Sequence, residues 1–251
     1  MSFDWDRFLT DAVTTPTGKR WLETAGDWAD KKIQPFSLGE ARDFVVKEER
    51  KDDCAIDPRK IVGTSHAKYN QGMTWRQFLG AGKKISTKLD VLELRPEYYD
   101  DPLAFDNDPN NKYGNPDGWH LAEIGNDLFI TEGNHRSVIA KFRAHEDGVT
   151  SQRVYSVLSL TISEDAMRAY DRLQAAYLPG ERDCGPERRL ISDANGVKVY
   201  QIRVRCGLHV FGGAPLKDME VHEAAEFVSN RNRLRKKVFD FIPNLYQKVF
   251  S

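Results

Sequence analysis

The fold of this chain is decided by the stretch LFITEGNHRS, residues 128–137. Its apolar start has the β-branched and aromatic content of a strand end. From Ser137 onward, Val138 and Phe142 fall on one face of a helix. Gly133 separates the two parts and can adopt a backbone conformation that side chains forbid, so the turn can be tight. The sequence therefore predicts a strand, a sharp turn and a helix.

The start of that helix carries groups that suit a phosphate. The first free N–H groups of a helix point into the turn before it and favour a negative ligand. Arg136 adds a planar guanidinium that fits phosphate, His135 an imidazole that titrates near neutrality, and Glu132 a carboxylate. The predicted phosphate-binding residues are Gly133, Asn134, His135, Arg136 and Ser137. The alternative is an ordinary turn in which Asn134 only caps the helix.

The box EGNHR, residues 132–136, follows a hairpin-like stretch, HLAEIGNDLFI, residues 120–130. Together they resemble the signature of the ParB/sulfiredoxin superfamily, which includes the ParB-like nucleases. The segment IDPRKI, residues 56–61, is similar to the entry strand and turn of that fold. The resemblance covers about residues 54–160 and implies an α/β (α+β) fold, with a small mixed sheet and flanking helices. It also implies that the turn binds nucleotide phosphates.

Departures from the family's patterns narrow the implied activity. Sulfiredoxins carry their reactive cysteine where this chain has Asn134, and an amide cannot replace that nucleophile, so sulfinic-acid reduction is disfavoured. The DNA-segregation clamps carry a different box, of the Gly-Glu-Arg-Arg type. The acidic-Gly-x-His-Arg box of the free-serine kinases and of the plasmid fertility-inhibition proteins matches best. Between those two groups the sequence does not choose.

Three functions remain open on this resemblance. The first is a nucleotide-dependent ATPase or DNase, with ATP or another nucleotide and Mg²⁺ as cofactors. In it Glu132 would hold the metal or orient water, His135 would act as general acid or base, and Arg136 would neutralise the phosphate. The second is a non-catalytic factor, such as a plasmid-encoded inhibitor of conjugative DNA transfer that binds a protein of the conjugation apparatus. The third is free-serine phosphorylation.

Composition limits these possibilities. The chain has 251 residues, 40% of them hydrophobic, which suffices for one large domain or for one core with additions. A net charge of −1 gives no overall attraction to DNA, so DNA binding would need a local patch. A cluster of cations near the C-terminus could track a phosphate backbone, or could form a solvated helix end. Its members are Arg231, Arg233, Arg235, Lys236 and Lys237.

The sequence predicts a cytoplasmic protein without a membrane span. No run of residues approaches the length of about eighteen apolar residues that a spanning helix needs. The first residues lack the form of a signal peptide. Three cysteines, an odd number without metal-type spacing, favour a reducing compartment.

The chain is predicted to have three parts. Residues 1–50 form a helical N-terminal extension, residues 51–162 the ParB/sulfiredoxin-like domain, and residues 163–251 a C-terminal α+β extension with a basic helix. The aromatic residues of the N-terminal part would either pack on the sheet or face a partner. The polar stretch 100–118 is predicted to be a long loop that could cover the phosphate site.

Overall fold

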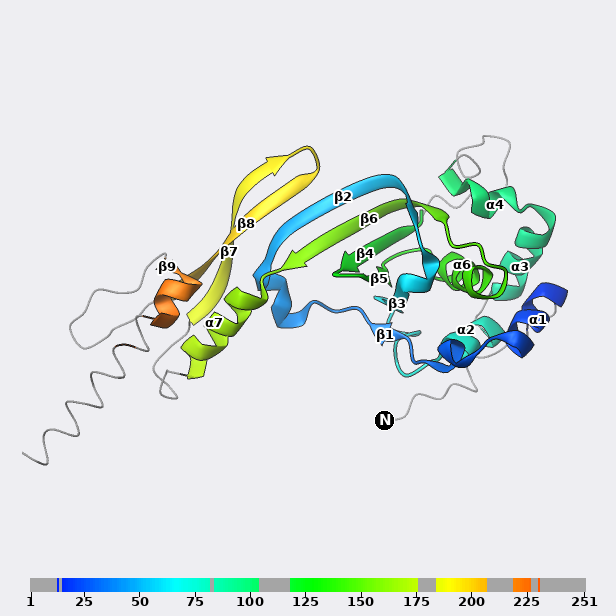
Figure 1. Cartoon of the computed structure of the whole chain (residues 1–251), viewed down its shortest axis with the longest axis horizontal. Coiled ribbons are helices and arrows are strands. Elements are labelled where there is room, and N and C mark those ends of the chain that lie inside the picture. The colour runs from blue at the N-terminus through cyan, green and yellow to red at the C-terminus, as the bar shows by residue number, and fades with distance from the viewer. Residues whose placement is uncertain are drawn as a thin grey trace, which may run out of the picture. The chain divides into compact units, whose positions relative to one another are not determined.

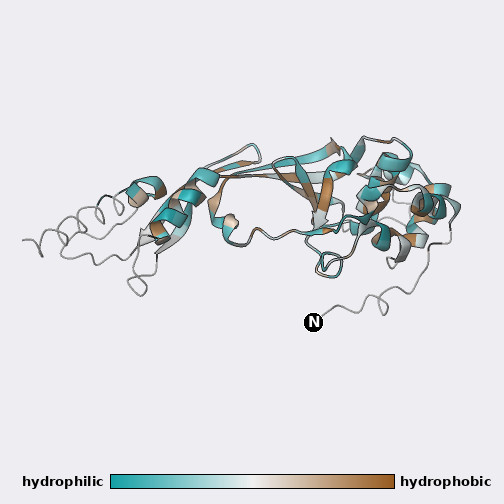
Figure 2. Cartoon of the chain, turned by 60° about the horizontal axis from the view of Figure 1, so that its bottom comes forward, coloured by the Kyte–Doolittle hydropathy of each residue, from teal (hydrophilic) through white to brown (hydrophobic). Residues whose placement is uncertain are grey.

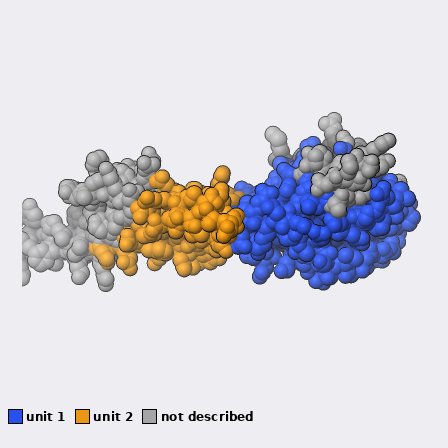
Figure 3. All heavy atoms as spheres, turned by 90° about the horizontal axis from the view of Figure 1, so that it is seen from above, with its two compact units in different colours: residues 1–37, 49–160 blue, residues 38–48, 161–251 orange. Residues whose placement is uncertain are grey.

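A computed structural model describes residues 13, 15–81, 84–103, 118–175, 184–206, 219–226 and 230, and within them the chain is a mixed α/β protein (Figure 1). This confirms the predicted α/β (α+β) class, whereas the ParB/sulfiredoxin-like arrangement remains a prediction. The residues group into two compact units, 1–37 with 49–160 and 38–48 with 161–251, which Figure 3 colours separately. The helices are α1 Pro16–Thr24, η1 Asp27–Asp30, η2 Gly39–Phe44, η3 Pro58–Lys60, α2 Trp75–Ala81, α3 Ile85–Leu94, α4 Glu97–Asp100, α6 Asn134–Glu146 and α7 Glu164–Ala175. The strands are β1 Gln34–Pro35, β2 Val45–Ile56, β3 Ile61–Thr64, β4 His120–Ile124, β5 Asp127–Ile130, β6 Gln152–Ile162, β7 Cys184–Ala194, β8 Val197–Cys206 and β9 Met219–Glu220.

The sheet of the first unit is mixed. Its strands follow the order β1-β3-β5-β4-β6-β2. β3 pairs with β5 in parallel, β4 and β5 form the predicted antiparallel hairpin, and β6 runs parallel to β4. β6, whose sequence is largely apolar or β-branched, lies inside this order, where both of its edges are paired. β5 then leads directly into α6, as the sequence predicts.

Helix α6 is the centre of the core of the first unit. It contacts α1, α2, α3 and β3, and its residues Val138, Ile139 and Phe142 are fully buried. The Trp21 ring of α1 stacks on Phe142 with 6.3 Å between centroids, so the described part of the N-terminal segment packs on this unit. Apolar and hydrophilic positions alternate around these helices (Figure 2). No helix among the described residues has both the length and the apolar content that a membrane crossing requires.

The N-terminal segment differs from the prediction of a separate helical extension. Residues 1–37 belong to the first unit, whereas residues 38–48 belong to the second. The prediction of helix up to residue 50 is wrong, because Gly39–Phe44 is a short 3-10 helix and Val45–Ile56 is strand β2. The charged residues of β2 favour a helix when taken alone, but pairing with neighbouring strands overrides that preference.

The second unit contains the hairpin β7–β8, strand β9 and helix α7. Asn195 and Gly196 form the hairpin turn with φ angles of 53° and 75°, as the Asn-Gly pair predicts. Helix α7 begins after Ser163, whose hydroxyl accepts a hydrogen bond from the Ala166 amide at 3.2 Å. The basic cluster at residues 231–237 lies outside the described residues.

The end of α6 makes the stability of the first unit sensitive to acid. His145 stacks on Trp28 with 3.9 Å between ring centroids. Burial, and then the nearby charges of Lys141 and Arg59, lowers the pKa of His145 from 6.5 to about 4. Unfolding therefore takes up a proton between these values, so we expect the free energy of unfolding to fall as pH drops from about 6.5 to about 4.

A His145→Phe variant, which keeps an aromatic ring on Trp28 and cannot titrate, tests this expectation. Its melting temperature should depend less steeply on pH than that of the wild type over the same range. Equal slopes in the two proteins would show that His145 does not contribute.

Candidate functional site

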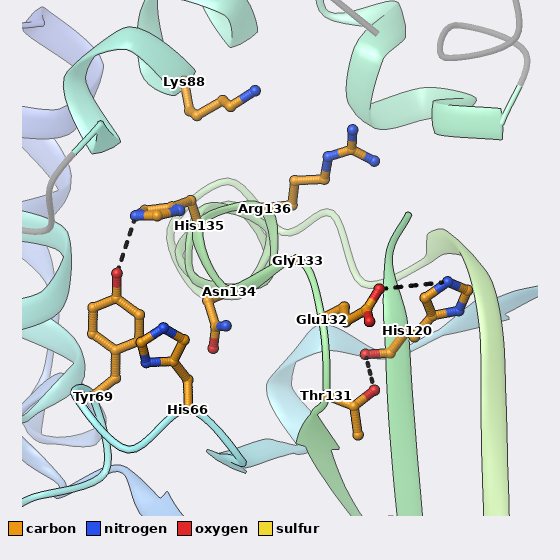
Figure 4. Close-up of a pocket in the computed structure, with 10 residues that line it drawn as sticks. All are labelled: His66, Tyr69, Lys88, His120, Thr131, Glu132, Gly133, Asn134, His135 and Arg136. Atoms are coloured by element: carbon orange, nitrogen blue, oxygen red, sulfur yellow. Dashed lines mark hydrogen bonds and ion pairs between the residues drawn. The ribbon is translucent and has the colours of Figure 1, made fainter. Parts of the chain in front are cut away.

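A pocket of about 600 Å³ lies at the start of α6. Four parts of the first unit converge on it: the segment after β3, helix α3, strand β4 and the turn from β5 into α6 (Figure 4). The lining residues are His66, Tyr69, Lys88, His120, Thr131, Glu132, Gly133, Asn134, His135 and Arg136. Six of the ten lining residues thus come from the predicted stretch 128–137, and the other four come from distant parts of the sequence.

Gly133 makes the turn that begins α6. It is the N-cap residue and has φ 81°, in the left-handed region that favours glycine. A Cβ atom at this position would lie 2.9 Å from Trp119 Cδ1, so the close approach also requires glycine. The Ser137 amide donates to the Gly133 carbonyl at 2.9 Å. The amides of residues 134–136 belong to the first turn of α6, where backbone N–H groups have no partner within the helix.

Arg136 is held by the phenol of Tyr98. Its side chain is buried, with 1% of its surface exposed. Nε donates to the Tyr98 hydroxyl at 2.6 Å, and the guanidinium carbon lies 4.6 Å from the centre of the Tyr98 ring. Lys88 Nζ donates to the same hydroxyl at 3.2 Å. One oxygen from α4 therefore fixes two cations on one side of the pocket.

We expect Tyr98→Phe to lower the free energy of unfolding by about 1.5–3 kcal/mol, since the variant removes an acceptor used by charged donors. Tyr99→Phe is the matched control. The Tyr99 hydroxyl is buried and has no hydrogen-bond partner among the described residues, so its removal should cost little or stabilise the protein. Urea denaturation of the two variants measures the difference. Equal losses would mean that the Tyr98 hydroxyl does not hold the cations.

Asn134 and His135 are oriented by the end of β3, by the segment after it and by helix α2. Thr64 Oγ1 donates to Asn134 Oδ1 at 2.6 Å, so the amide is anchored to the end of that strand. His135 Nε2 lies 3.4 Å from the Tyr69 hydroxyl, and its ring is edge-on to the rings of Tyr69 and Phe78. Both side chains line the pocket, but these contacts also stabilise the start of α6.

Glu132 and His120 lie next to each other in the wall of the pocket. The Glu132 side chain is 56% exposed, and its Oε2 lies 3.9 Å from His120 Nε2. The other ring nitrogen of His120, Nδ1, is 2.8 Å from Ser156 Oγ on β6. Figure 4 shows this pair on the side of the turn away from Lys88 and His135. Both groups border the pocket, where they can form hydrogen bonds to a bound molecule.

Ser137 is placed differently from the other predicted binding residues. It is fully buried, and its hydroxyl accepts a hydrogen bond from Trp119 Nε1 at 2.8 Å. It is not among the lining residues. The hydroxyl therefore anchors the helix start against Trp119 and does not reach the pocket.

The described residues near Glu132 do not form a metal-binding site. Among the described residues, no group of three or more His, Cys, Asp or Glu side chains is placed to hold a metal ion. Glu132 is the single carboxylate among the described lining residues. Mg²⁺ can be held by one carboxylate when phosphate oxygens and water supply its other ligands. Glu132, however, already lies 3.9 Å from His120 Nε2, so it does not by itself make a metal site among the described residues.

The pocket as a whole favours an anion. The cations Lys88 and Arg136 and the positive end of the α6 dipole border it. This charge exceeds that of the single carboxylate. Comparison of the chain with protein-family models, with curated proteins and with solved structures gives no match.

The sequence did not point to the pocket residues outside the turn. His66 follows β3, which is parallel to β5, so the two strand ends lie at the same edge of the sheet. That placement could have been anticipated had the parallel pairing been predicted. His120 stands at the start of the predicted hairpin and was a usable signal. Lys88 and Tyr98 come from helices that carry no local sign of a site.

Proposed function

We propose that this chain is a nucleotide-binding protein of the ParB/sulfiredoxin type. It hydrolyses either the phosphoanhydride bond of a nucleotide, as an ATPase, or a phosphodiester bond of DNA, as a nuclease. The observation that carries the proposal is the pocket at the start of α6, where Arg136 and Lys88 share one phenol oxygen beside a glycine turn. The order of hairpin, turn and helix supports the resemblance, since the box EGNHR lies at the first turn of α6.

Different residues of the pocket bind the phosphate and activate the attacking water. The amides of residues 134–136 and the two cations bind and neutralise the phosphate. A preorganised donor of this kind is commonly worth about 3–4 kcal/mol of transition-state stabilisation. Glu132, exposed at the rim beside His120, helps to orient the attacking water. When bound, Mg²⁺ would neutralise charge on the phosphate oxygens.

Thermal unfolding with a panel of ligands tests the binding step. The panel contains inorganic phosphate, ATP, CTP and adenosine, each with and without MgCl₂. A ligand at a hundred times its dissociation constant adds about 2.7 kcal/mol to the free energy of unfolding, so true binding is visible as a higher melting temperature. Adenosine, which lacks phosphate, is the control and should have little effect. If no phosphorylated ligand stabilises the protein, the proposal is wrong.

Product analysis then separates the reactions. Release of phosphate from ATP identifies an ATPase, and nicking of plasmid DNA identifies a nuclease. Phosphoserine formed from serine and ATP or ADP would assign a kinase instead. Stabilisation by nucleotide without any of these products would leave a binding protein and would remove the catalytic part of the proposal.

A further inference from the structure

The imidazole of His120 is fixed at both of its nitrogens. Nδ1 lies 2.8 Å from Ser156 Oγ, and Nε2 lies 3.9 Å from Glu132 Oε2. Ser156 is buried, with 5% of its surface exposed, whereas Glu132 is open to the pocket. The ring therefore connects a buried hydroxyl to an accessible carboxylate (Figure 4).

The backbone makes this arrangement a consequence of the fold. His120 and Ser156 are register partners in the parallel pair β4–β6, so their side chains stand next to each other. The His120 carbonyl accepts from the Thr131 amide at 3.0 Å and from Thr131 Oγ1 at 2.9 Å, which fixes the residue to the turn. Tyr155 adds a ring edge-on to the imidazole, with 5.8 Å between centroids.

Space around Nε2 is also restricted. A Cβ atom at Gly118 would lie 2.5 Å from His120 Nε2, so a residue without a side chain is needed there. Gly118 has φ 75°, a further reason for glycine. The imidazole can therefore keep this orientation only because position 118 leaves room for it.

The imidazole of His135 lies in different surroundings. It is edge-on to Tyr69 and Phe78, and its Nε2 is 3.4 Å from the Tyr69 hydroxyl. Those contacts suit a ring that supports the helix start. His120 instead has its Nε2 beside the carboxylate that would compensate the charge of a protonated ring.

We propose that His120 is the general base of this pocket, that Ser156 is its positioning residue, and that Glu132 stabilises the protonated imidazole. The inference rests on the proposed hydrolysis and assigns its proton transfer to a residue outside the box EGNHR. With Nδ1–H donating to Ser156 Oγ, the neutral ring leaves Nε2 free to accept a proton.

Water is the nucleophile and the proton donor in the proposed hydrolysis. The oxygen of a water molecule bonds to phosphorus while the bond from phosphorus to the leaving oxygen breaks, and that oxygen keeps the electron pair. The water proton moves to His120 Nε2, and Glu132 then faces an imidazolium. The imidazolium next returns the proton to the leaving group or to solvent, which restores the neutral ring.

His120→Asn tests the assignment, because the Asn amide can still donate to Ser156 Oγ but has no group at the position of Nε2. With ATP and MgCl₂ as substrate, we expect kcat to fall by about 100-fold or more, as for loss of a general base. The melting-temperature increase caused by ATP should persist. His222→Asn, the same substitution at an exposed position of the second unit, is the control and should retain full activity.

Ser156→Ala should lower kcat by about tenfold without raising KM, since the ring loses its fixed orientation but not its Nε2. Ser156→Thr keeps the hydroxyl and should restore most of the rate. A purely structural role would instead lower the melting temperature of both variants and leave kcat of the folded protein unchanged.

The remaining outcomes would contradict the assignment of His120 as the base, and each would do so in a way that can be told apart from the others. Full activity of His120→Asn would exclude the base, and loss of the ATP-induced stabilisation in that variant would mean that His120 only binds phosphate. A wild-type protein that binds ATP without hydrolysing it would overturn the role of His120 and leave the anion site intact. A wild-type protein that no phosphorylated ligand stabilises would overturn the proposed function itself.

Discussion

Arg136→Ala is expected to remove most of the stabilisation of the protein by phosphorylated ligands. A hydrogen bond to a charged group is worth about 1.5–3 kcal/mol, and the guanidinium also supplies charge to the pocket. The affinity for phosphate should therefore fall by about two orders of magnitude, which lowers the ligand-induced increase in free energy of unfolding from about 2.7 to about 0.4 kcal/mol at the same ligand concentration.

The measurement must separate binding from folding, since Arg136 is buried and its loss weakens the unliganded protein. The relevant quantity is the melting-temperature increase that ATP produces within each variant. Arg143→Ala is the matched control on the same helix. Arg143 pairs with Asp100 at 3.0 Å and is not a lining residue, so this variant should keep the increase. Undiminished stabilisation of Arg136→Ala by ATP would refute the phosphate site.

Arg136→Lys refines this test. Lysine keeps the charge but lacks the planar fork and the Nε–H that donates to the Tyr98 hydroxyl. We expect intermediate affinity, between the wild type and Arg136→Ala. Affinity equal to that of the wild type would show that charge alone matters and that the contact with Tyr98 has no effect on binding.

The strand, turn and helix around Gly133 could be predicted because their signals are local. An apolar strand end, a residue that tolerates positive φ and a helical apolar face occur within fifteen residues of one another. The same locality made the hairpin at Asn195-Gly196 and the helix after Ser163 predictable. In each case one or two residues determine the local backbone conformation, so distant contacts are not needed to predict it.

The rest of the pocket depends on contacts between distant parts of the sequence. Tyr98 holds Arg136 across 38 residues, and Ser156 orients His120 across 36. Sequence periodicity cannot predict such pairs, because each of these residue types is common in a helix or strand whether or not it contacts a distant residue. Strand β2 was mispredicted for a related reason. Its charged residues favour a helix, and only pairing with other strands makes the extended form stable.

Gly133→Ala is expected to lower the free energy of unfolding by about 2–5 kcal/mol. The left-handed conformation of residue 133 costs a side chain about 1–2 kcal/mol. A methyl group placed 2.9 Å from Trp119 Cδ1 must also push the indole aside, and overpacking of this kind costs about 1–3 kcal/mol. Urea denaturation of the variant and the wild type measures the sum.

Gly125→Ala separates the two contributions to that loss. Gly125, in the turn of the β4–β5 hairpin, has φ 63°, and nothing lies within 4 Å of a Cβ atom placed there. Its substitution should therefore cost only the conformational part, about 1–2 kcal/mol. The excess loss at position 133 then measures the contact with Trp119, whose Nε1 donates to Ser137. Because displacement of this indole would also move the start of α6, Gly133→Ala should weaken phosphate binding, whereas Gly125→Ala should not. Equal losses of stability in the two variants would mean that the indole moves aside without cost, and the tight approach at Gly133 would then have no part in shaping the pocket.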